Sequence, residues 1–124
     1  MSNNLYERLG SATGISDLVD DIVEAHMNNP LIKARFLPYR EKPDVLAKIK
    51  RHTCNFLGAG SGGPEQYSGR SMLDAHRGMN ISEQEYMAAV DDILASLDKH
   101  KVDDQSRKEV LAIAYSLKGQ IVRV

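Results

Sequence analysis

Apolar residues recur along the chain at steps of three and four, which is the spacing of one face of an α-helix. The clearest stripe consists of Ile15, Leu18, Val19, Ile22, Val23 and Met27, and Asn28, Asn29 and Pro30 end it. Three further stripes follow: Val45, Ile49, His52 and Phe56, then Tyr86, Val90, Ile93, Leu94 and Leu97, and finally Val110, Ile113, Ala114, Leu117 and Ile121. No run alternates Val, Ile or Thr with polar residues as a strand does. The pattern predicts an all-α protein with four substantial helices.

Proline and glycine mark the boundaries in the first half. The stretch from Pro30 to Phe36 has room only for a short helical piece, and the prolines of LPYREKPD (37–44) predict a loop after it. Pro43 suits the first turn of the second long helix. The sequence GAGSGG (58–63) predicts the end of that helix and a long, pliable connection, because each glycine disfavours helix.

Capping residues mark the boundaries in the second half. Ser82 and Glu85 have the Ser-x-x-Glu spacing of a capping box, and so do Ser106 and Glu109. We therefore expect a box at the start of each of the last two helices, the second of which begins near Asp104. Before them, SMLDAHRG (71–78) has room for about two helical turns.

Size and charge restrict the class of protein. The 124 residues predict a single domain over residues 1–124. Sixteen basic and 17 acidic residues give a net charge of −1, which disfavours a nucleic-acid or anionic membrane partner. No apolar run reaches the roughly 18 residues of a membrane span, and the first residues do not have the pattern of a secretory signal. We expect a cytoplasmic monomer, and the single cysteine, Cys54, excludes an internal disulfide and a cysteine-rich metal site.

Candidate chemistry rests on the four histidines. His52 lies on an apolar stripe, and His76 shares a face with Met72 in the short segment between two glycine-rich breaks. His26 is interpreted as a residue at the edge of its stripe and His100 as a surface residue that stabilises a helix C-terminus. The acidic pairs 91–92 and 103–104 are assigned to solvated surface.

Two imidazoles that face one interior are a poor zinc site, because zinc takes three or four protein ligands. They suit haem better, since the porphyrin supplies four nitrogens to the iron and the protein needs to add only one axial histidine. For His52 the alternative is a hydrogen-bonded core histidine, whereas a packed core histidine is not an obvious need in the short segment that holds His76.

The chain resembles the truncated haemoglobins, and most of all their group I subfamily, over nearly its whole length. The residues that carry the resemblance are QYSGRSMLDAH (66–76), LYERLG (5–10), Thr13-Gly14-Ile15, Asp20-Asp21-Ile22, Arg35-Phe36, Met79-Asn80-Ile81 and Tyr86. The first of these is similar to the family's run that ends in the proximal histidine. The resemblance implies a shortened globin fold, a two-on-two helical sandwich around one haem b.

Carried over by position, the resemblance assigns roles to nine residues. His76 is expected to be the proximal iron ligand, with Phe36 packed on the haem. Further haem contacts are expected from Phe56 and Met72, and from Val23, Ile49, His52 and Thr53 on the distal side. Lys48 is either the partner of a haem propionate or an ordinary exposed lysine. His52 is either a sixth iron ligand when no gas is bound or a distal hydrogen-bonding histidine.

The chain departs from the family's distal pattern at two positions. Val23 stands where many members have a tyrosine that donates a hydrogen bond to bound dioxygen, and Ile49 stands where a glutamine is frequent. Neither hydrocarbon side chain can donate. We therefore expect weaker retention of dioxygen, readier oxidation and less discrimination against carbon monoxide than in relatives with the tyrosine.

The resemblance implies reversible binding of dioxygen, nitric oxide or carbon monoxide at the iron. A catalytic alternative is nitric oxide dioxygenation or peroxidase-like turnover, with an unidentified reductase as a partner. A helical interaction module without a cofactor is the third class, although it leaves the placement of His76 unexplained. The residues do not decide between these uses or assign a role to Cys54.

Overall fold

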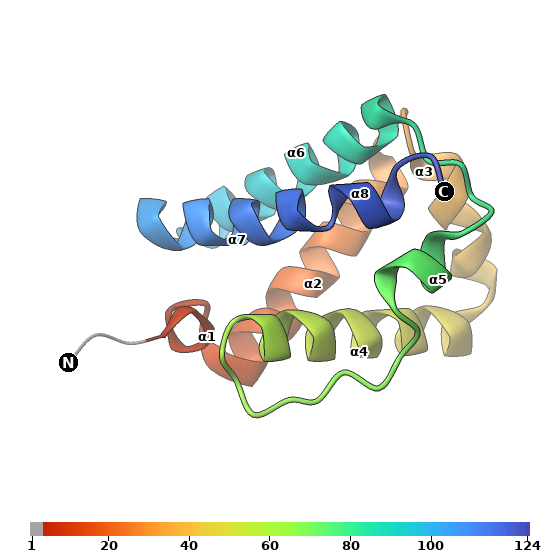
Figure 1. Cartoon of the computed structure of the whole chain (residues 1–124). Helices are drawn as coiled ribbons and strands as arrows, with labels where there is room; N and C mark the ends of the chain where they lie inside the picture. The colour runs from red at the N-terminus through yellow and green to blue at the C-terminus, as the bar shows by residue number, and fades with distance from the viewer. Residues whose placement is uncertain (1–3) are drawn as a thin grey trace.

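The structure is a computed structural model that describes residues 4–124 (Figure 1). Its elements are α1 (Leu5–Arg8), α2 (Ser11–Asn28), α3 (Lys33–Phe36), the 3-10 helix η1 (Leu37–Glu41), α4 (Pro43–Gly60), α5 (Met72–His76), α6 (Glu83–Lys99), α7 (Asp104–Ser116) and α8 (Lys118–Ile121). Within these residues there is no strand, and the one isolated β-bridge joins Ile81 to Val122. The predicted all-α class is confirmed.

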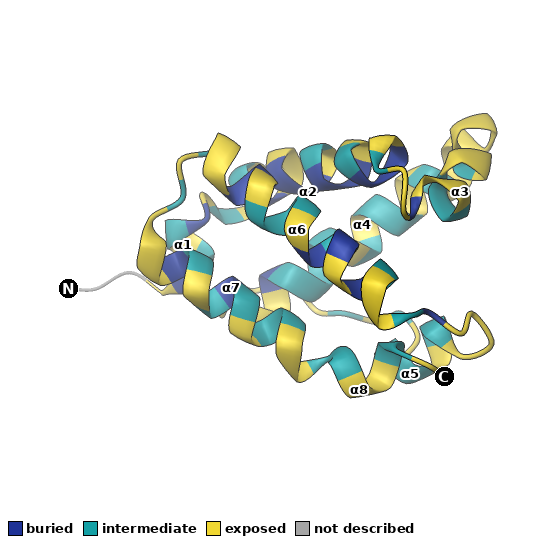
Figure 2. Cartoon of the chain, turned by 90° about the horizontal axis from the view of Figure 1, so that it is seen from above, coloured by how far each residue is buried: buried dark blue, intermediate teal, exposed yellow. Residues whose placement is uncertain are grey.

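Two pairs of helices form the body of the molecule. Helix α2 packs against both α4 and α6, and α6 packs against α7, so that the α2–α4 pair lies against the α6–α7 pair (Figure 1). The buried residues concentrate on α2 and α6 (Figure 2). At their centre Val19 and Leu97 have no exposed surface, and each buried aliphatic side chain stabilises the fold by about 1.5–3 kcal/mol. The predicted two-on-two sandwich is thus confirmed.

The end of α4 differs from the prediction. The helix continues through Gly58, Ala59 and Gly60, because Ser61 closes it instead. The Ser61 amide donates to the carbonyl of Leu57, and its hydroxyl donates to that of Gly58 at 3.1 Å. These bonds satisfy carbonyls at the helix end and offset the poor helix propensity of glycine.

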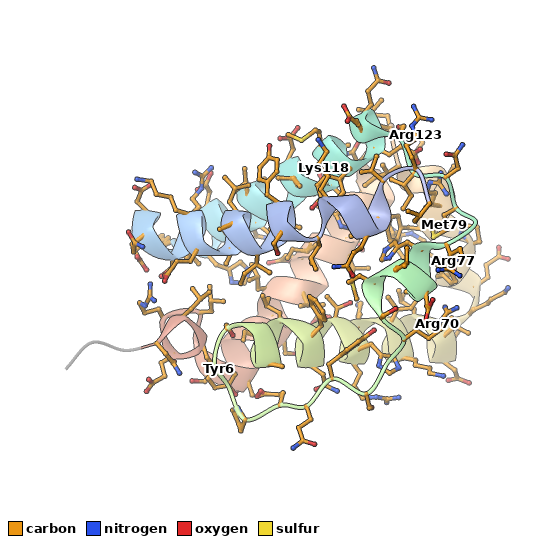
Figure 3. The ribbon with its side chains drawn as sticks, in the orientation of Figure 1. Tyr6, Arg70, Arg77, Met79, Lys118 and Arg123 are labelled. Carbon is orange, nitrogen blue, oxygen red and sulfur yellow. The ribbon has the colours of Figure 1, made fainter. Side chains whose placement is uncertain are left out.

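The connection after α4 begins as an anchored segment and not as a pliable one. The Tyr6 amide donates to the Ser61 carbonyl at 2.9 Å, and the Tyr6 hydroxyl donates to Oε1 of Glu65 at 2.6 Å. A Cβ atom at Gly63 would lie 2.3 Å from the Tyr6 ring, so only glycine fits there. We call this contact of α1 with residues 61–65 the α1 clasp; Figure 3 shows Tyr6 at the end of the molecule opposite Arg70 and Arg77.

One of the two predicted capping boxes is correct. At the start of α6, the Ser82 hydroxyl accepts from the Glu85 amide, and the Glu85 carboxylate accepts from the Ser82 amide at 3.1 Å. The box at Ser106 is wrong, because Asp103 caps α7 and accepts both the amide and the hydroxyl of Ser106. Asp103 and Ser106 are three residues apart, which is the same spacing that led to the expectation of a box at Ser106 and Glu109.

The last stripe, predicted as one helix, is broken at Leu117, whose amide donates to the carbonyl of Ala114 three residues back. The chain then returns to the segment that follows His76. The amides of Gly78 and Asn80 donate to the carbonyl of Val124 at 3.2 and 3.1 Å, and the Arg123 amide donates to that of Ile81. The C-terminal residues therefore hold the connection between α5 and α6.

Two further observations bear on the class of protein. Within residues 4–124, no helix is both long and apolar enough to cross a membrane. Cys54 is half-buried on α4, and burial raises the pKa of its thiol, which keeps it protonated at neutral pH.

Candidate functional site

A cavity of about 960 Å³ lies between α4 and the helices α5 and α6. This volume is at the upper end of the range for small-molecule and cofactor sites, about 300–1,000 Å³. Its lining is mainly apolar and includes Ile32, Phe36, Val45, Ile49, Ala75, Met79, Ile81, Val90, Ile93, Leu117 and Ile121. Polar and titratable side chains line it as well, and those that bear on its chemistry are described below.

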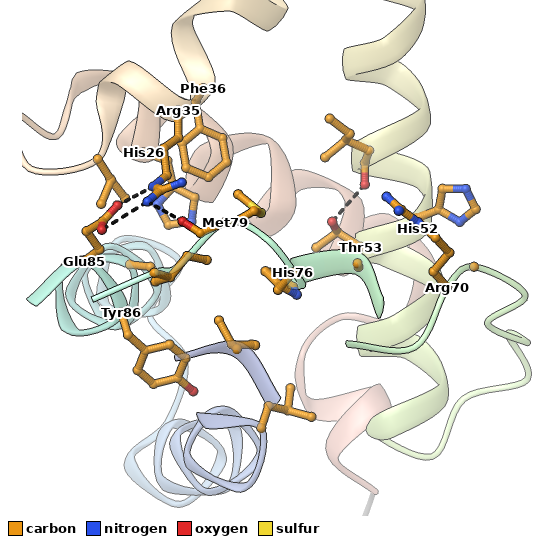
Figure 4. Close-up of a pocket in the computed structure, with 18 of the residues that line it drawn as sticks. His26, Arg35, Phe36, His52, Thr53, Arg70, His76, Met79, Glu85 and Tyr86 are labelled. Atoms are coloured by element: carbon orange, nitrogen blue, oxygen red, sulfur yellow. Dashed lines mark hydrogen bonds and ion pairs between the residues drawn. The ribbon is translucent and has the colours of Figure 1, made fainter. Parts of the chain in front are cut away.

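His76 reaches the cavity from the last turn of α5 (Figure 4). Ser71 caps this short helix by accepting from the Asp74 amide at 3.1 Å. The Nδ1 atom of His76 lies 2.7 Å from the carbonyl oxygen of Met72, so Nδ1 carries the proton and donates it. The neutral ring then has its lone pair on Nε2, which is the form in which histidine binds a metal.

Helix α4 forms the opposite wall with Val45, Lys48, Ile49, His52 and Thr53. These positions follow steps of three and four, as expected for one helix face. The Thr53 hydroxyl donates to the Ile49 carbonyl of its own helix at 2.8 Å. Its proton is therefore not available to a ligand, and the wall is more apolar than its sequence indicates.

His52 lines the cavity from its edge. Its ring makes an edge contact with Tyr67, with 6.0 Å between the ring centroids. In Figure 4 the ring lies on the other side of α4 from Thr53 and His76. Its Nδ1 atom is buried and has no hydrogen-bond partner among residues 4–124. A buried nitrogen without a hydrogen-bond partner raises the free energy of the folded state. The position of His52 is therefore one where a partner is missing or where the ring turns.

His26 was interpreted as an edge residue, but the structure buries it to 8% exposure in the cavity wall. Its Nδ1 lies 2.7 Å from Oδ2 of Asp92, and its ring packs on Phe36 with 5.0 Å between centroids. Asp92 also accepts from the Asn29 side chain at 3.1 Å. The assignment of Asp92 to solvated surface is therefore wrong, because its side chain is only 14% exposed. Burial lowers the pKa of His26, although the bond to Asp92 acts in the opposite direction.

An ion pair closes another part of the wall. The Arg35 guanidinium binds the Glu85 carboxylate and also donates to the Met79 carbonyl at 3.1 Å. It thereby joins α3 to the segment after His76 and to the start of α6. The hydrogen bond from Arg35 is the main reason that the pKa of Glu85 falls from 4.5 to about 2.

Six of the nine residues assigned from the sequence line the cavity: Phe36, Lys48, Ile49, His52, Thr53 and His76. The other three do not line it. Val23 is buried in the helical core, Phe56 packs edge-on against Tyr67, and Met72 supplies the carbonyl that orients His76.

The sequence interpretation missed His26, Asp92, Arg35 and Glu85 as groups that act together. His26 is four residues after Ile22 and therefore on the buried stripe, which is the signal that could have placed it inside. Its partner is 66 positions away, and no spacing rule connects them.

Within residues 4–124, no three His, Cys, Asp or Glu side chains are grouped as a metal site. The arrangement at His76 instead offers one imidazole nitrogen to a large apolar cavity. That combination suits a cofactor that brings most of its own metal ligands, as a haem does.

Comparison with protein families matches residues 4–123 to the family described as bacterial-like globin. Among curated proteins, a group 1 truncated haemoglobin, GlbN, of a Synechocystis species is 32% identical over 117 residues, and the match covers 90% of each chain. A group 1 truncated haemoglobin of Tetrahymena pyriformis is 28% identical over 100 residues, which covers 81% of this chain and 78% of the relative.

Solved structures show the same fold. The crystal structure of truncated haemoglobin from Tetrahymena pyriformis in its Fe(III) form has a TM-score of 0.88 at 22% identity, covering 98% of this chain and all of that one. The 2/2 haemoglobin of a Synechococcus species, solved in a cyanomet state with covalently attached haem, has a TM-score of 0.82 at 23% identity and covers 95% of each chain.

Proposed function

The chain belongs to the bacterial-like globin family, as a truncated haemoglobin of group 1, and from this we propose that it holds one haem b and binds diatomic gases at the haem iron. The observation that carries the proposal is the placement of His76. Its Nδ1 is occupied by the Met72 carbonyl, and its side chain lines the cavity, so Nε2 is the nitrogen available for iron. When bound, the haem supplies an iron with a free position for a gas molecule.

The described residues fit this cofactor. Apolar side chains of α4, α6 and α8 offer an environment for the porphyrin, and Phe36 supports the proposed contact with its face. The cations Lys48 and Arg70 also line the cavity and are suited to the carboxylates of a haem. Lys48 is therefore proposed as the partner of a propionate.

The character of the α4 wall supports the proposed ligands. Val45 and Ile49 present hydrocarbon, and the Thr53 hydroxyl is bound to its own helix. Carbon monoxide and nitric oxide need little hydrogen bonding, whereas dioxygen is retained better where a donor is present. We expect the ferrous protein to release dioxygen faster than relatives with a distal tyrosine, and a stopped-flow measurement of the dissociation rate would check this.

His52 is proposed as a second, reversible iron ligand. The unpartnered Nδ1 supports this, because iron coordination would use a nitrogen of a ring that is not fully hydrogen-bonded. The edge contact with Tyr67 has to be given up for the ring to turn toward His76.

Optical spectra of the haem-reconstituted protein test both histidines. The ferric and ferrous forms are compared with His52→Ala, His76→Ala and, as a matched control, His100→Ala, since His100 does not line the cavity. We expect His76→Ala to lose haem affinity, and His52→Ala to convert a six-coordinate low-spin spectrum to high-spin. His100→Ala is expected to match the parent.

Each part of the proposal has its own contrary result. Absence of a Soret band in the parent would overturn haem binding. Unchanged spectra and haem affinity in His76→Ala would remove His76 as the ligand. A parent spectrum indifferent to His52→Ala would leave His76 as the only protein ligand and the α4 wall as an open, apolar pocket.

A catalytic use of the same cavity is the second candidate, either nitric oxide dioxygenation or peroxidase-like turnover. The observation that favours it is the His26–Asp92 pair, which places a group with acid–base capacity in the cavity wall. Repeated nitric oxide dioxygenation requires a reductase as partner to restore ferrous iron, and the chain is proposed to be a monomer. Sedimentation velocity of the haem-loaded protein measures the oligomeric state.

A further inference from the structure

The His26–Asp92 pair is the buried polar group of the cavity that the proposed haem ligation does not use. His26 comes from α2 and Asp92 from α6, so the pair spans the two layers of the sandwich. Their side chains are 11% and 14% exposed, and the two atoms that meet are 2.7 Å apart. Asn29 holds the carboxylate from a second direction, and Phe36 covers one face of the imidazole.

The carboxylate decides which nitrogen of His26 carries the proton. An ionised carboxylate only accepts hydrogen bonds, so Nδ1 must donate to Asp92. Burial lowers the pKa of the imidazole, which favours the neutral ring at neutral pH. Nε2 then carries a lone pair.

Nε2 is open to the cavity. No residue among 4–124 forms a hydrogen bond with it, and it is not one of the buried unpartnered atoms. Since His26 lines the cavity and its Nδ1 is occupied by Asp92, we infer that Nε2 is the nitrogen that meets that space. A neutral nitrogen with a free lone pair accepts a proton or a hydrogen bond and donates neither.

The other charged groups of this wall are engaged elsewhere. Arg35 and Glu85 bind each other, and Arg35 also holds the Met79 carbonyl. Asn29, the residue that follows α2, is already bonded to Asp92 through its side chain. His26 is therefore the base that this wall presents to a molecule inside the cavity.

We propose that His26, held by Asp92, removes the proton from small protic ligands of the type H–X, such as hydrogen cyanide, hydrogen sulfide or hydrogen peroxide, as they enter the cavity. This inference rests on the proposed haem site, to which the resulting anion would bind. In the step, the H–X bond breaks, its electron pair stays on X, and an Nε2–H bond forms. The positive charge on the imidazole is balanced by the Asp92 carboxylate, and no oxidant or reductant is needed.

The proposal separates two classes of ligand. Carbon monoxide carries no proton and gains nothing from a base in the wall. Hydrogen cyanide is largely protonated at pH 7 and binds as cyanide after losing its proton. A general base typically accelerates such a step by about 10²–10⁴-fold.

The test uses the haem-loaded ferric protein and cyanide at pH 7, with association followed by stopped-flow absorbance. We expect His26→Gln to slow cyanide association at least tenfold and Asp92→Asn to slow it by a smaller factor, because the imidazole remains but loses its counter-charge. Carbon monoxide association to the ferrous forms is expected to change less than twofold.

A matched control is present in the same chain. His100 also binds an aspartate, with its Nε2 2.6 Å from Oδ2 of Asp21, but it does not line the cavity. His100→Gln is expected to leave both ligands unaffected. Equal slowing of cyanide and carbon monoxide in His26→Gln would indicate general damage to the pocket and would overturn the proposal.

A second measurement does not depend on ligand binding. In ¹⁵N-labelled protein, long-range ¹H–¹⁵N correlation spectra report which nitrogen of His26 is protonated. The proposal requires the proton on Nδ1, and a proton on Nε2 in the neutral ring would overturn it. A Soret band with normal carbon monoxide binding but unchanged cyanide rates in both variants would overturn this inference alone, whereas loss of the Soret band in the parent would overturn the haem site.

Discussion

At the scale of single residues, the Arg35–Glu85 pair shows how a cavity-wall interaction depends on pH. Both side chains are less than one third exposed, and the guanidinium holds the pKa of Glu85 at about 2 compared with 4.5 in the unfolded chain. A carboxyl group with a lowered pKa in the folded state stabilises that state above its unfolded pKa. This contribution is complete above about pH 4.5 and is lost as the pH falls toward 2.

Glu85→Gln tests this contribution. We expect the free energy of unfolding at pH 7 to fall by roughly 1–2 kcal/mol, because a shielded, charge-assisted hydrogen bond is lost. The difference from the parent should narrow between about pH 5 and pH 3 in urea titrations. Glu83→Gln is the control, since Glu83 is 70% exposed and lies 3.6 Å from Lys118. A constant difference at all pH values would contradict the assignment.

The sequence predicted the His76 side of the site better than the side formed by His26 and Asp92. His76 was found because its local sequence is distinctive and because its orienting contact, the Met72 carbonyl, is four residues away. His26 and Asp92 were assigned separately, one to a helix edge and the other to the surface. The environment of each is set by the other, and a contact across 66 positions leaves no local pattern. Val23 was assigned to the cavity by position, but the packing of α2 places it in the core.

At the scale of elements, the segment after His76 is held from two sides. Arg35 bonds its Met79 carbonyl, and the C-terminal residues bond Gly78, Asn80 and Ile81 through their backbone. α5 itself has only five residues and no buried side chain. The orientation of His76 therefore depends on these contacts more than on the packing of its own helix.

Deleting residues 122–124 removes the backbone bonds to this segment. We expect transfer of haem to a scavenger apoglobin to become roughly tenfold faster. A factor of ten corresponds to about 1.4 kcal/mol, which is what one or two backbone hydrogen bonds contribute. The measurement is the change in Soret absorbance after mixing. Arg123→Ala keeps the backbone bonds and should leave the rate unchanged. An unchanged rate in the deletion variant would show that these bonds do not support His76.

The long helices were predictable because each buries a stripe that repeats with the helical period. Their ends were less predictable, because they depend on which polar group is free to cap. α4 passes through two glycines because Ser61 satisfies its carbonyls, and α7 begins near Asp104 as predicted but is capped by Asp103 and not by Ser106. In both cases the competing signals were present in the sequence, and the hydrogen bonds made in the fold decided between them.

At the scale of the whole molecule, the cavity is large for a chain of 124 residues. Val45 is 42% exposed and Met79 38% exposed along its edge. A ligand that binds only the folded state raises the free energy of unfolding by RT ln(1 + [L]/Kd), where [L] is the free ligand concentration and Kd its dissociation constant. The haem is therefore expected to contribute a substantial part of the stability.

We expect haem loading to raise the free energy of unfolding by about 4 kcal/mol when free haem is near 1,000 times Kd. Urea unfolding followed by far-ultraviolet circular dichroism, with and without haem, measures the difference. In His76→Ala the gain should be much smaller, because iron ligation is lost. An equal gain in the parent and this variant would mean that the porphyrin is held without His76.

The α1 clasp has a consequence for the order of folding. Among the long-range hydrogen bonds of α1, those of Tyr6 form the clasp with Ser61 and Glu65, and those of Arg8 reach Ser106 and Glu109 outside it. The contacts of Arg8 close a loop of about 100 residues, and closing it costs chain entropy before the contacts form. The partners of Arg8 lie 98 and 101 positions later in the sequence, so they are synthesised long after α1. We therefore expect α1 to be fixed late in folding, and residues 61–65, which lead toward His76, to be fixed with it.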